Sequence, residues 1–185
     1  MPRSAVLMMD LQTDFLAEGG AQPVISRDAL RILETANAIL DLKILVTTIP
    51  IFVVNQFPLS DRIGNFLRHS AAIVDTSGAD IDHRVHTRDG IKRIPKSKSS
   101  AFTNPELSEF LKANDVDHIY IFGVFAEGCV RATTLEARRL GYTVTIPMDA
   151  IGSHADLKKA YARWSMRRAG AVFVPTLLTK EYENL

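Results

Sequence analysis

Three reactive side chains in this sequence each lie just beyond a predicted strand: Asp10, Lys96 and Cys129. The preceding segments are AVLMM before the aspartate, GIKRIP before the lysine, and HIYIFG followed by a short turn before the cysteine. A carboxylate, an ammonium group and a thiol could together carry out acyl transfer on an amide carbonyl. Cys129 is the only cysteine in the chain, so an intramolecular disulfide cannot form.

The position of Cys129 favours reactivity. A helical pattern begins at this residue, and the first turn of a helix favours thiolate over thiol through the helix dipole and its unpaired N–H groups. Lys96 could add positive charge, while Asp10 could take the thiol proton and later deliver it to a leaving amine. The same N–H groups could hold the oxyanion of a tetrahedral intermediate.

Each of the three residues also has a simpler explanation. A lone cysteine in apolar surroundings is often core filling, Asp10 could cap the turn after its strand, and Lys96 could lie in a solvated basic loop. None of the five histidines is well placed to partner the cysteine, and the spacings typical of a metal site are missing. From the residues alone, these alternatives stay open.

The elements that must position these side chains are short apolar runs that alternate with segments of helical period. This alternation is typical of βαβ units around a mainly parallel, six-stranded sheet in an α/β fold. The carboxyl ends of such strands form one rim, where ligands bind. The predicted strands are Ser4 to Met9, Lys43 to Ile49, Gly90 to Ile94, His118 to Gly123, Thr143 to Pro147 and Ala171 to Val174.

Capping residues delimit the predicted helices. Ser26 is a plausible N-cap for the amphipathic helix that follows it, and Asn104 with Pro105 marks the start of another. Gly141 and Gly170 are the expected C-terminal stops of the last two helices. We expect residues 55–81 to form a long irregular excursion over the sheet.

Bulk properties narrow the functional classes. The 185 residues, 46% of them hydrophobic, predict a single domain over 1–185. The 22 basic and 21 acidic residues leave a formal charge of +1, which favours a small-molecule partner over nucleic acid or a membrane. The N-terminus lacks an apolar signal region and no run approaches the roughly 20 residues of a membrane span, so we expect a cytoplasmic protein.

Four motifs taken together resemble the isochorismatase-like cysteine hydrolases, which include nicotinamidases, N-carbamoylsarcosine amidases and ureidoacrylate amidases. They are MDLQTDF at 9–15, KSKSSAF at 96–102, GVFAEGCVRATTLEARRLGYTV at 123–144 and DA at 149–150. The resemblance spans most of the chain. It implies a three-layer α/β/α sandwich in which Asp10 is the general base, Lys96 the supporting cation and Cys129 the nucleophile. Lys98 is the rival lysine, but Lys96 has the family's spacing to SAF.

The resemblance also implies an oxyanion hole and a pocket. The family's cis peptide would join Phe125 to Ala126, and the backbone N–H groups of Ala126 and Cys129 would hold the oxyanion. Gln12, Phe15 and Phe125 are implied as pocket residues. Many members have threonine where this chain has Ala126, so a hydroxyl that could touch substrate is missing.

The implied activity is hydrolysis of an amide or ureido C–N bond of a small molecule, through a thioester and without a metal or other cofactor. The apolar PIFVVNQFP, expected after the second strand, replaces the metal-holding Asp and His residues of nicotinamidases. The alternative is a catalytically silent ligand-binding or scaffold member; a thiol redox sensor would lack a resolving cysteine. The resemblance further implies a homodimer or homotetramer, which the exposed helices that carry Trp164 and Met166 could support.

Overall fold

The computed structural model describes residues 3–41 and 47–178, and its centre is a six-stranded sheet. Every pair of neighbouring strands is parallel, and the strand order is β3-β2-β1-β4-β5-β6. The strands are β1 (Arg3–Met9), β2 (Ile49–Asn55), β3 (Lys92–Lys96), β4 (Val116–Gly123), β5 (Thr143–Pro147) and β6 (Val172–Val174). The predicted α/β class is confirmed, and the sheet is wholly rather than mainly parallel.

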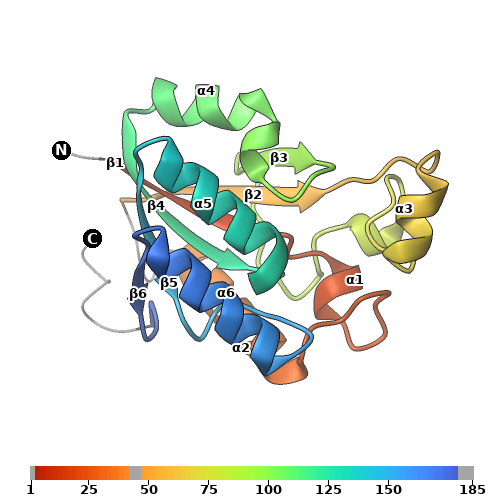
Figure 1. The fold of residues 1–185 in the computed structure, drawn as a ribbon. Helices are drawn as coiled ribbons and strands as arrows, with labels where there is room; N and C mark the ends of the chain where they lie inside the picture. The colour runs from red at the N-terminus through yellow and green to blue at the C-terminus, as the bar shows by residue number, and fades with distance from the viewer. Residues whose placement is uncertain (1–2, 42–46, 179–185) are drawn as a thin grey trace.

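Helices cover both faces of the sheet (Figure 1). They are α1 (Thr13–Leu16), α2 (Ser26–Leu40), α3 (Arg62–Leu67), α4 (Pro105–Ala113), α5 (Arg131–Arg139) and α6 (Asp156–Arg168). One core joins the sheet to α1 and α2, and a second joins it to α4, α5 and α6. The fold is therefore the three-layer α/β/α sandwich that the resemblance implies.

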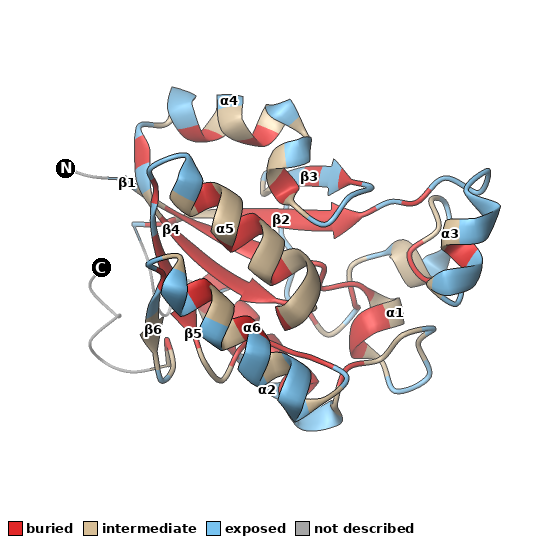
Figure 2. Cartoon of the chain, in the orientation of Figure 1, coloured by how far each residue is buried: buried red, intermediate tan, exposed pale blue. Residues whose placement is uncertain are grey.

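Strand β1 lies at the centre of the sheet and is buried on both faces (Figure 2). Since successive side chains of a strand point to opposite faces, Val6 and Met8 enter the core with α2, whereas Leu7 and Met9 enter the core with α4 to α6. A strand covered on both sides needs a continuous apolar run. The run AVLMM thus places Asp10 directly beyond a rigid, buried element.

The second strand is not where the sequence predicts it. The prediction was Lys43 to Ile49, of which residues 43–46 lie outside the described residues, while the structure places β2 at Ile49–Asn55. The apolar residues after Pro50 alternate between the two cores, and a proline is tolerated near the start of a strand. PIFVVN is therefore part of the strand rather than the connection after it.

The predicted helix starts differ in accuracy. Asn104 caps α4 as predicted, with its side chain accepting a hydrogen bond from Glu106 N at 3.0 Å, and Pro105 is the first helical residue. Ser26 is not an N-cap, because it is the first residue of α2, and Ile25 precedes it without a side-chain capping bond. A polar residue near the start of an apolar pattern can thus lie just inside the helix.

The excursion over residues 55–81 contains α3 and is fastened to α1 and its surroundings. The Thr13 amide donates to Asp80 O at 3.0 Å, and the Ala72 amide donates to Asp14 Oδ2 at 2.8 Å. Figure 1 shows α3 projecting beyond the carboxyl ends of the strands. None of the described helices is long and apolar enough to cross a membrane.

Candidate active site

Asp10, Lys96 and Cys129 meet at the carboxyl edge of the sheet. Asp10 follows β1, Lys96 is the last residue of β3, and Cys129 lies in a π-helical turn, Ala126–Val130, between β4 and α5. The Lys96 Nζ atom is 3.0 Å from Asp10 Oδ2 and 3.1 Å from Cys129 Sγ. The structure thus brings together the three residues that the sequence predicts, from positions up to 119 residues apart (129 − 10).

The approach of β1 to β4 depends on Gly123. This glycine has a φ of 116°, and a Cβ atom built on it would lie 2.1 Å from Met9 O. The next amide, Val124 N, donates to the same oxygen at 3.0 Å. Asp10 itself has a φ of 56° and its amide donates to Val53 O at 2.8 Å, so its backbone is tied to β2. Only glycine, which has no side chain, allows position 123 to pack this closely against Met9 of β1.

All three hydrogen-bond donors of the Lys96 ammonium group are used. Its ammonium group can donate three hydrogen bonds, and it contacts three acceptors: Asp10 Oδ2, Cys129 Sγ and Asn55 Oδ1, the last at 2.6 Å. The Lys96 side chain is fully buried. The rival Lys98 is exposed and makes none of these contacts. The sequence spacing to SAF therefore selects the lysine that reaches the thiol.

Asn55 is a site residue that the sequence analysis missed. It ends β2, is buried, and places Nδ2 3.8 Å from Cys129 Sγ. The misplaced second strand hid it, because the strand prediction put this residue in a loop. Its signal in the sequence is the same as that of Asp10: a polar residue directly after an apolar strand.

Burial and the charges of the neighbouring groups shift the pKa values of all three residues. Burial raises the pKa of Asp10, although Lys96 and Cys129 oppose that shift. Burial and the neighbouring Asp10 raise the pKa of Cys129 to about 11, outweighing the opposite effect of Lys96. Burial acts to lower the pKa of Lys96, but Asp10 and Cys129 raise it overall.

The direction of the Cys129 shift corrects the sequence-based expectation of a favoured thiolate. The positive end of the helix and the ammonium group do not outweigh burial and the Asp10 carboxylate, so the resting sulfur is protonated. The Oδ1 atom of Asp10 is buried and accepts no hydrogen bond from the described residues, and Cys129 acts to lower the pKa of this carboxyl group. The thiol proton therefore has an acceptor within the site.

The predicted oxyanion hole needs correction. The Ala126 amide donates to Gly152 O at 2.8 Å, so it is already occupied, and the prediction that it faces an oxyanion is wrong. The cis peptide bond joins Val124 to Phe125, one residue before the predicted Phe125–Ala126 bond. The structure places the Cys129 amide within the same turn, at the start of the helix.

Gln12 holds the backbone of Asn55 in place instead of lining a pocket. Its side chain is fully buried, with Nε2 donating to Asn55 O at 2.8 Å and to Ala79 O at 2.7 Å. Its Oε1 accepts from Asn55 N at 2.8 Å. These bonds occupy both donors of the amide and tie the ends of β1 and β2 together, so the prediction of a pocket residue is wrong for Gln12.

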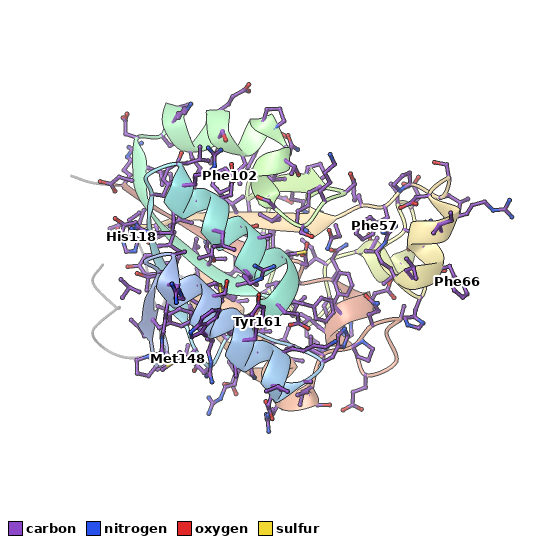
Figure 3. All side chains as sticks on the ribbon, viewed as in Figure 1. Phe57, Phe66, Phe102, His118, Met148 and Tyr161 are labelled. Atoms are coloured by element: carbon purple, nitrogen blue, oxygen red, sulfur yellow. The ribbon has the colours of Figure 1, made fainter. Side chains whose placement is uncertain are left out.

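Two aromatic residues separate into a buried one and an accessible one. Phe15 is 2% exposed and meets the Phe125 ring edge-on, with centroids 5.3 Å apart. Phe125 is partly exposed and stacks on His154, with centroids 4.3 Å apart. Of the predicted aromatic pocket residues, only Phe125 presents accessible surface beside the Cys129 turn. Figure 3 shows all described side chains on the ribbon.

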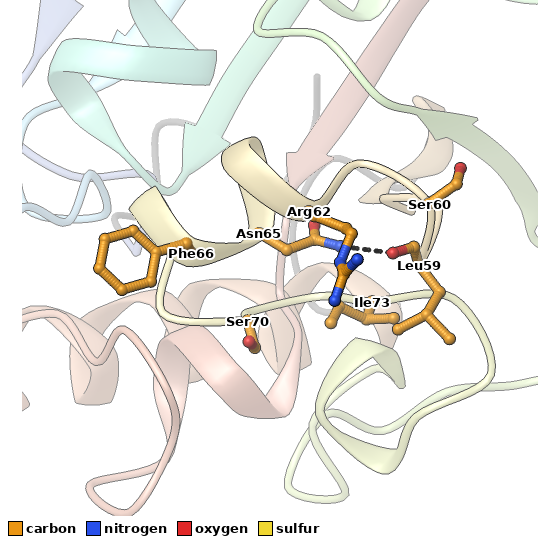
Figure 4. Close-up of a pocket in the computed structure, with 7 residues that line it drawn as sticks. All are labelled: Leu59, Ser60, Arg62, Asn65, Phe66, Ser70 and Ile73. Atoms are coloured by element: carbon orange, nitrogen blue, oxygen red, sulfur yellow. Dashed lines mark hydrogen bonds between the residues drawn. The ribbon is translucent and has the colours of Figure 1, made fainter.

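A separate cavity of about 720 Å³ lies in the excursion (Figure 4). It is lined by Leu59, Ser60, Arg62, Asn65, Phe66, Ser70 and Ile73. None of the predicted site residues lines it, and Asn65 Nδ2 donates to Leu59 O across its wall at 3.5 Å. Within residues 3–41 and 47–178, no group of three or more His, Cys, Asp or Glu side chains is arranged to hold a metal ion.

Comparison with known proteins places the chain in a family. The model of the isochorismatase domain matches residues 4–177. A probable inactive nicotinamidase from Arabidopsis thaliana is 31% identical over 162 residues, covering 80% of this chain and 79% of that protein. N-carbamoylsarcosine amidase from Arthrobacter sp is 35% identical over 92 residues; the match covers 50% of this chain and only 34% of that protein's length.

Solved structures agree with the fold. The crystal structure of nicotinamidase PncA from Bacillus subtilis superimposes with a TM-score of 0.82 at 22% identity, covering 92% of this chain and 98% of that chain. At this identity the likeness shows the fold alone. The match of the domain model over residues 4–177, together with this architecture, establishes that the chain belongs to the isochorismatase family.

Proposed function

We propose that this protein is a cysteine hydrolase that cleaves a C–N bond, amide or ureido, of a small molecule. The observation that carries the proposal is the buried Lys96 ammonium, which contacts the Asp10 carboxylate and the Cys129 sulfur at 3.0 Å and 3.1 Å. A nucleophile, a proton acceptor and a cation in mutual contact are the parts that acyl transfer requires. The amidases and nicotinamidases among the named relatives support the hydrolase class.

In the first half of the reaction, Asp10 takes the thiol proton as Cys129 Sγ attacks the substrate carbonyl carbon. The charge that develops on the carbonyl oxygen is held by the Cys129 N–H and by the Phe125 N–H, which donates to none of the described residues. Lys96 stabilises the sulfur while it is negatively charged. The C–N bond then breaks, Asp10 returns the proton to the leaving nitrogen, and a thioester remains on Cys129.

In the second half, Asp10 removes a proton from a water molecule, whose oxygen attacks the thioester carbonyl. The C–S bond breaks, the acid product leaves, and the sulfur regains a proton from Asp10. The raised pKa of Asp10 suits its role as the base in both halves of the reaction, because a carboxylate with a higher pKa is a stronger base. Each proton that Asp10 accepts is thus returned within one catalytic cycle.

The proposed reaction uses no metal. Strand β2 ends at Asn55 and is followed by Gln56 and Phe57, so this segment carries two carboxamides and an aromatic ring. It lacks the imidazole and carboxylate groups that bind divalent transition metals. The substrate that we propose is small and neutral, because the charges of Asp10 and Lys96, the two ionised groups beside the sulfur, neutralise each other.

The alternative is a catalytically silent ligand-binding or scaffold member of the family, which the similarity to a probable inactive nicotinamidase favours. A screen of small amides and ureido compounds for released ammonia or amine tests both. The proposal predicts turnover that survives treatment with a chelator and that disappears in Cys129→Ala, with the circular dichroism and melting curve retained. Turnover by a folded Cys129→Ala protein, or saturable binding without any product, would overturn it.

The homodimer or homotetramer implied by the resemblance stays a prediction. Trp164 is 56% exposed, as required for a role in association, but Met166 is fully buried, so it cannot contribute in the way the sequence suggested. Exposed apolar side chains next to Trp164 on α6 include Leu157 and Tyr161, spaced by about one turn. Light scattering combined with size-exclusion chromatography would give the mass of the assembly.

A further inference from the structure

We propose that Asn55 is a positioning residue of this site: it fixes the Lys96 ammonium and donates a hydrogen bond to the Cys129 sulfur when that sulfur becomes negatively charged. This inference rests on the proposed function. It concerns a residue for which the sequence motifs gave no role.

The contacts of Asn55 serve both groups at once. Its Oδ1 accepts from Lys96 Nζ at 2.6 Å, and its Nδ2 lies 3.8 Å from Cys129 Sγ with donor geometry. The carboxamide therefore bridges the cation and the nucleophile. Because Asp10 and the sulfur occupy the other two donors of the ammonium, Asn55 completes its coordination and leaves no buried N–H unpaired.

The neutral amide is important for the charge of the site. With Asp10 ionised and Lys96 protonated, the resting site carries no net charge, and proton transfer from Cys129 to Asp10 leaves that sum unchanged. A carboxylate at position 55 would satisfy the ammonium equally well but would add a negative charge beside the sulfur. Such a charge disfavours the thiolate, whereas an amide N–H stabilises it.

The backbone of Asn55 is held so that its side chain keeps this position. Gln12 bonds to both the N–H and the C=O of Asn55, at 2.8 Å each, and residue 55 pairs with Lys96 in the register of β2 and β3. Asn55 is buried, which restricts its side chain further. The chain from Gln12 through Asn55 to Lys96 thus connects the ends of three adjacent strands to one sulfur atom.

The test is the pH dependence of iodoacetamide alkylation, followed by intact mass, which reports Cys129 alone because the chain has no other cysteine. We compare wild type with Asn55→Asp and Asn55→Ala. The control is Asn114→Ala, the same change at the C-cap of α4, where the side chain bonds only to Phe110 O. Melting curves establish that each variant is folded.

The proposal predicts that Asn55→Asp moves the alkylation midpoint upward by about one pH unit or more, which slows labelling at pH 8 about tenfold. Asn55→Ala should move it in the same direction by less, and Asn114→Ala should match wild type. A merely structural role predicts the opposite result, because a loosened site would label faster and its midpoint would fall toward that of an ordinary cysteine. A midpoint that stays or falls in both folded Asn55 variants would overturn the proposal.

This experiment is independent of the substrate. If Asn55 variants shift the midpoint but no amide is hydrolysed, the proposed function fails and the positioning role stands. If a substrate is hydrolysed by wild type and the Asn55 variants keep the wild-type midpoint, the positioning role fails and the function stands.

Discussion

Replacing Asp10 by asparagine should make the thiol more reactive while it abolishes hydrolysis. The pKa of Cys129 is raised from an ordinary value of 9.0 to about 11, by burial and by the Asp10 carboxylate. Asp10→Asn removes that carboxylate and leaves Lys96 with the sulfur as its one partner able to carry a negative charge. The pKa of Cys129 should therefore fall.

The size of the effect follows from the titration. At pH 8, a thiol with a pKa near 11 is thiolate in about one molecule per thousand, and a thiol with a pKa near 9 in about one per ten. The difference is about a hundredfold. Since the burial of Cys129 remains in the variant, we expect alkylation at pH 8 to accelerate between about tenfold and a hundredfold.

The assay is iodoacetamide labelling of wild type and Asp10→Asn between pH 6 and 10, read by intact mass. Asp156→Asn is the matched control, because its side chain is 64% exposed at the start of α6. Hydrolysis by Asp10→Asn should be lost in spite of the more abundant thiolate, since no general acid remains to deliver a proton to the leaving nitrogen. Equal or slower labelling of a folded Asp10→Asn protein would refute the electrostatic reasoning.

Two further predictions concern stability. Gly123→Ala should lower the free energy of unfolding by more than about 2 kcal/mol, or roughly 4–8 °C in Tm, because its Cβ would meet Met9 O at 2.1 Å; Gly19→Ala, with open space around it, should not. A Tm for Gly123→Ala within about 1–2 °C of wild type would contradict the close packing, because 1 kcal/mol corresponds to roughly 2–4 °C in a chain of this size. Burial lowers the pKa of His118 from 6.5, although Asp117 opposes the shift. The unfolded chain therefore binds a proton that the folded chain resists, and stability should fall as the pH drops below 6.5. In melts at pH 7.5 and 5.5, His118→Gln should lose less stability than wild type or than His83→Gln, whose side chain is 85% exposed; equal losses in all three would count against it.

The sequence predicted most of this sheet because most of its strands are apolar runs with clear ends. The third strand, KRIPK, is not such a run, and it lies at Lys92–Lys96 rather than at the predicted Gly90 to Ile94. Strands β1, β4 and β5 are buried between helices, and a continuous apolar run such as AVLMM is typical of a strand that is covered on both faces. The prediction of the second strand was wrong because two apolar segments follow one another in the sequence, one before Pro50 and one after it. The local pattern does not decide which of them pairs with β1. Long-range pairing decides it, and this information is not local.

The site also combines features that the local sequence predicts with features that depend on long-range contacts. Asp10, Lys96 and Cys129 could be predicted because each lies at or just beyond the carboxyl end of a strand, and these ends converge in a parallel sheet. Asn55 was lost with its strand. The direction of the Cys129 shift could not be predicted either, since it is set by the balance of burial, Asp10 and Lys96 in three dimensions. The occupied amide of Ala126 depends on Gly152, which is 26 residues away (152 − 126).

Strand β3 is the outermost strand on its side of the sheet, and it carries Lys96. An edge strand is held by one neighbour only, so its local opening costs less free energy than unfolding of the whole domain. The rest of the core could persist while β3 detaches, but the cation would then leave the sulfur. Heat should therefore inactivate this protein before it melts, and the local stability of this edge strand, rather than the overall stability of the fold, would set its working lifetime.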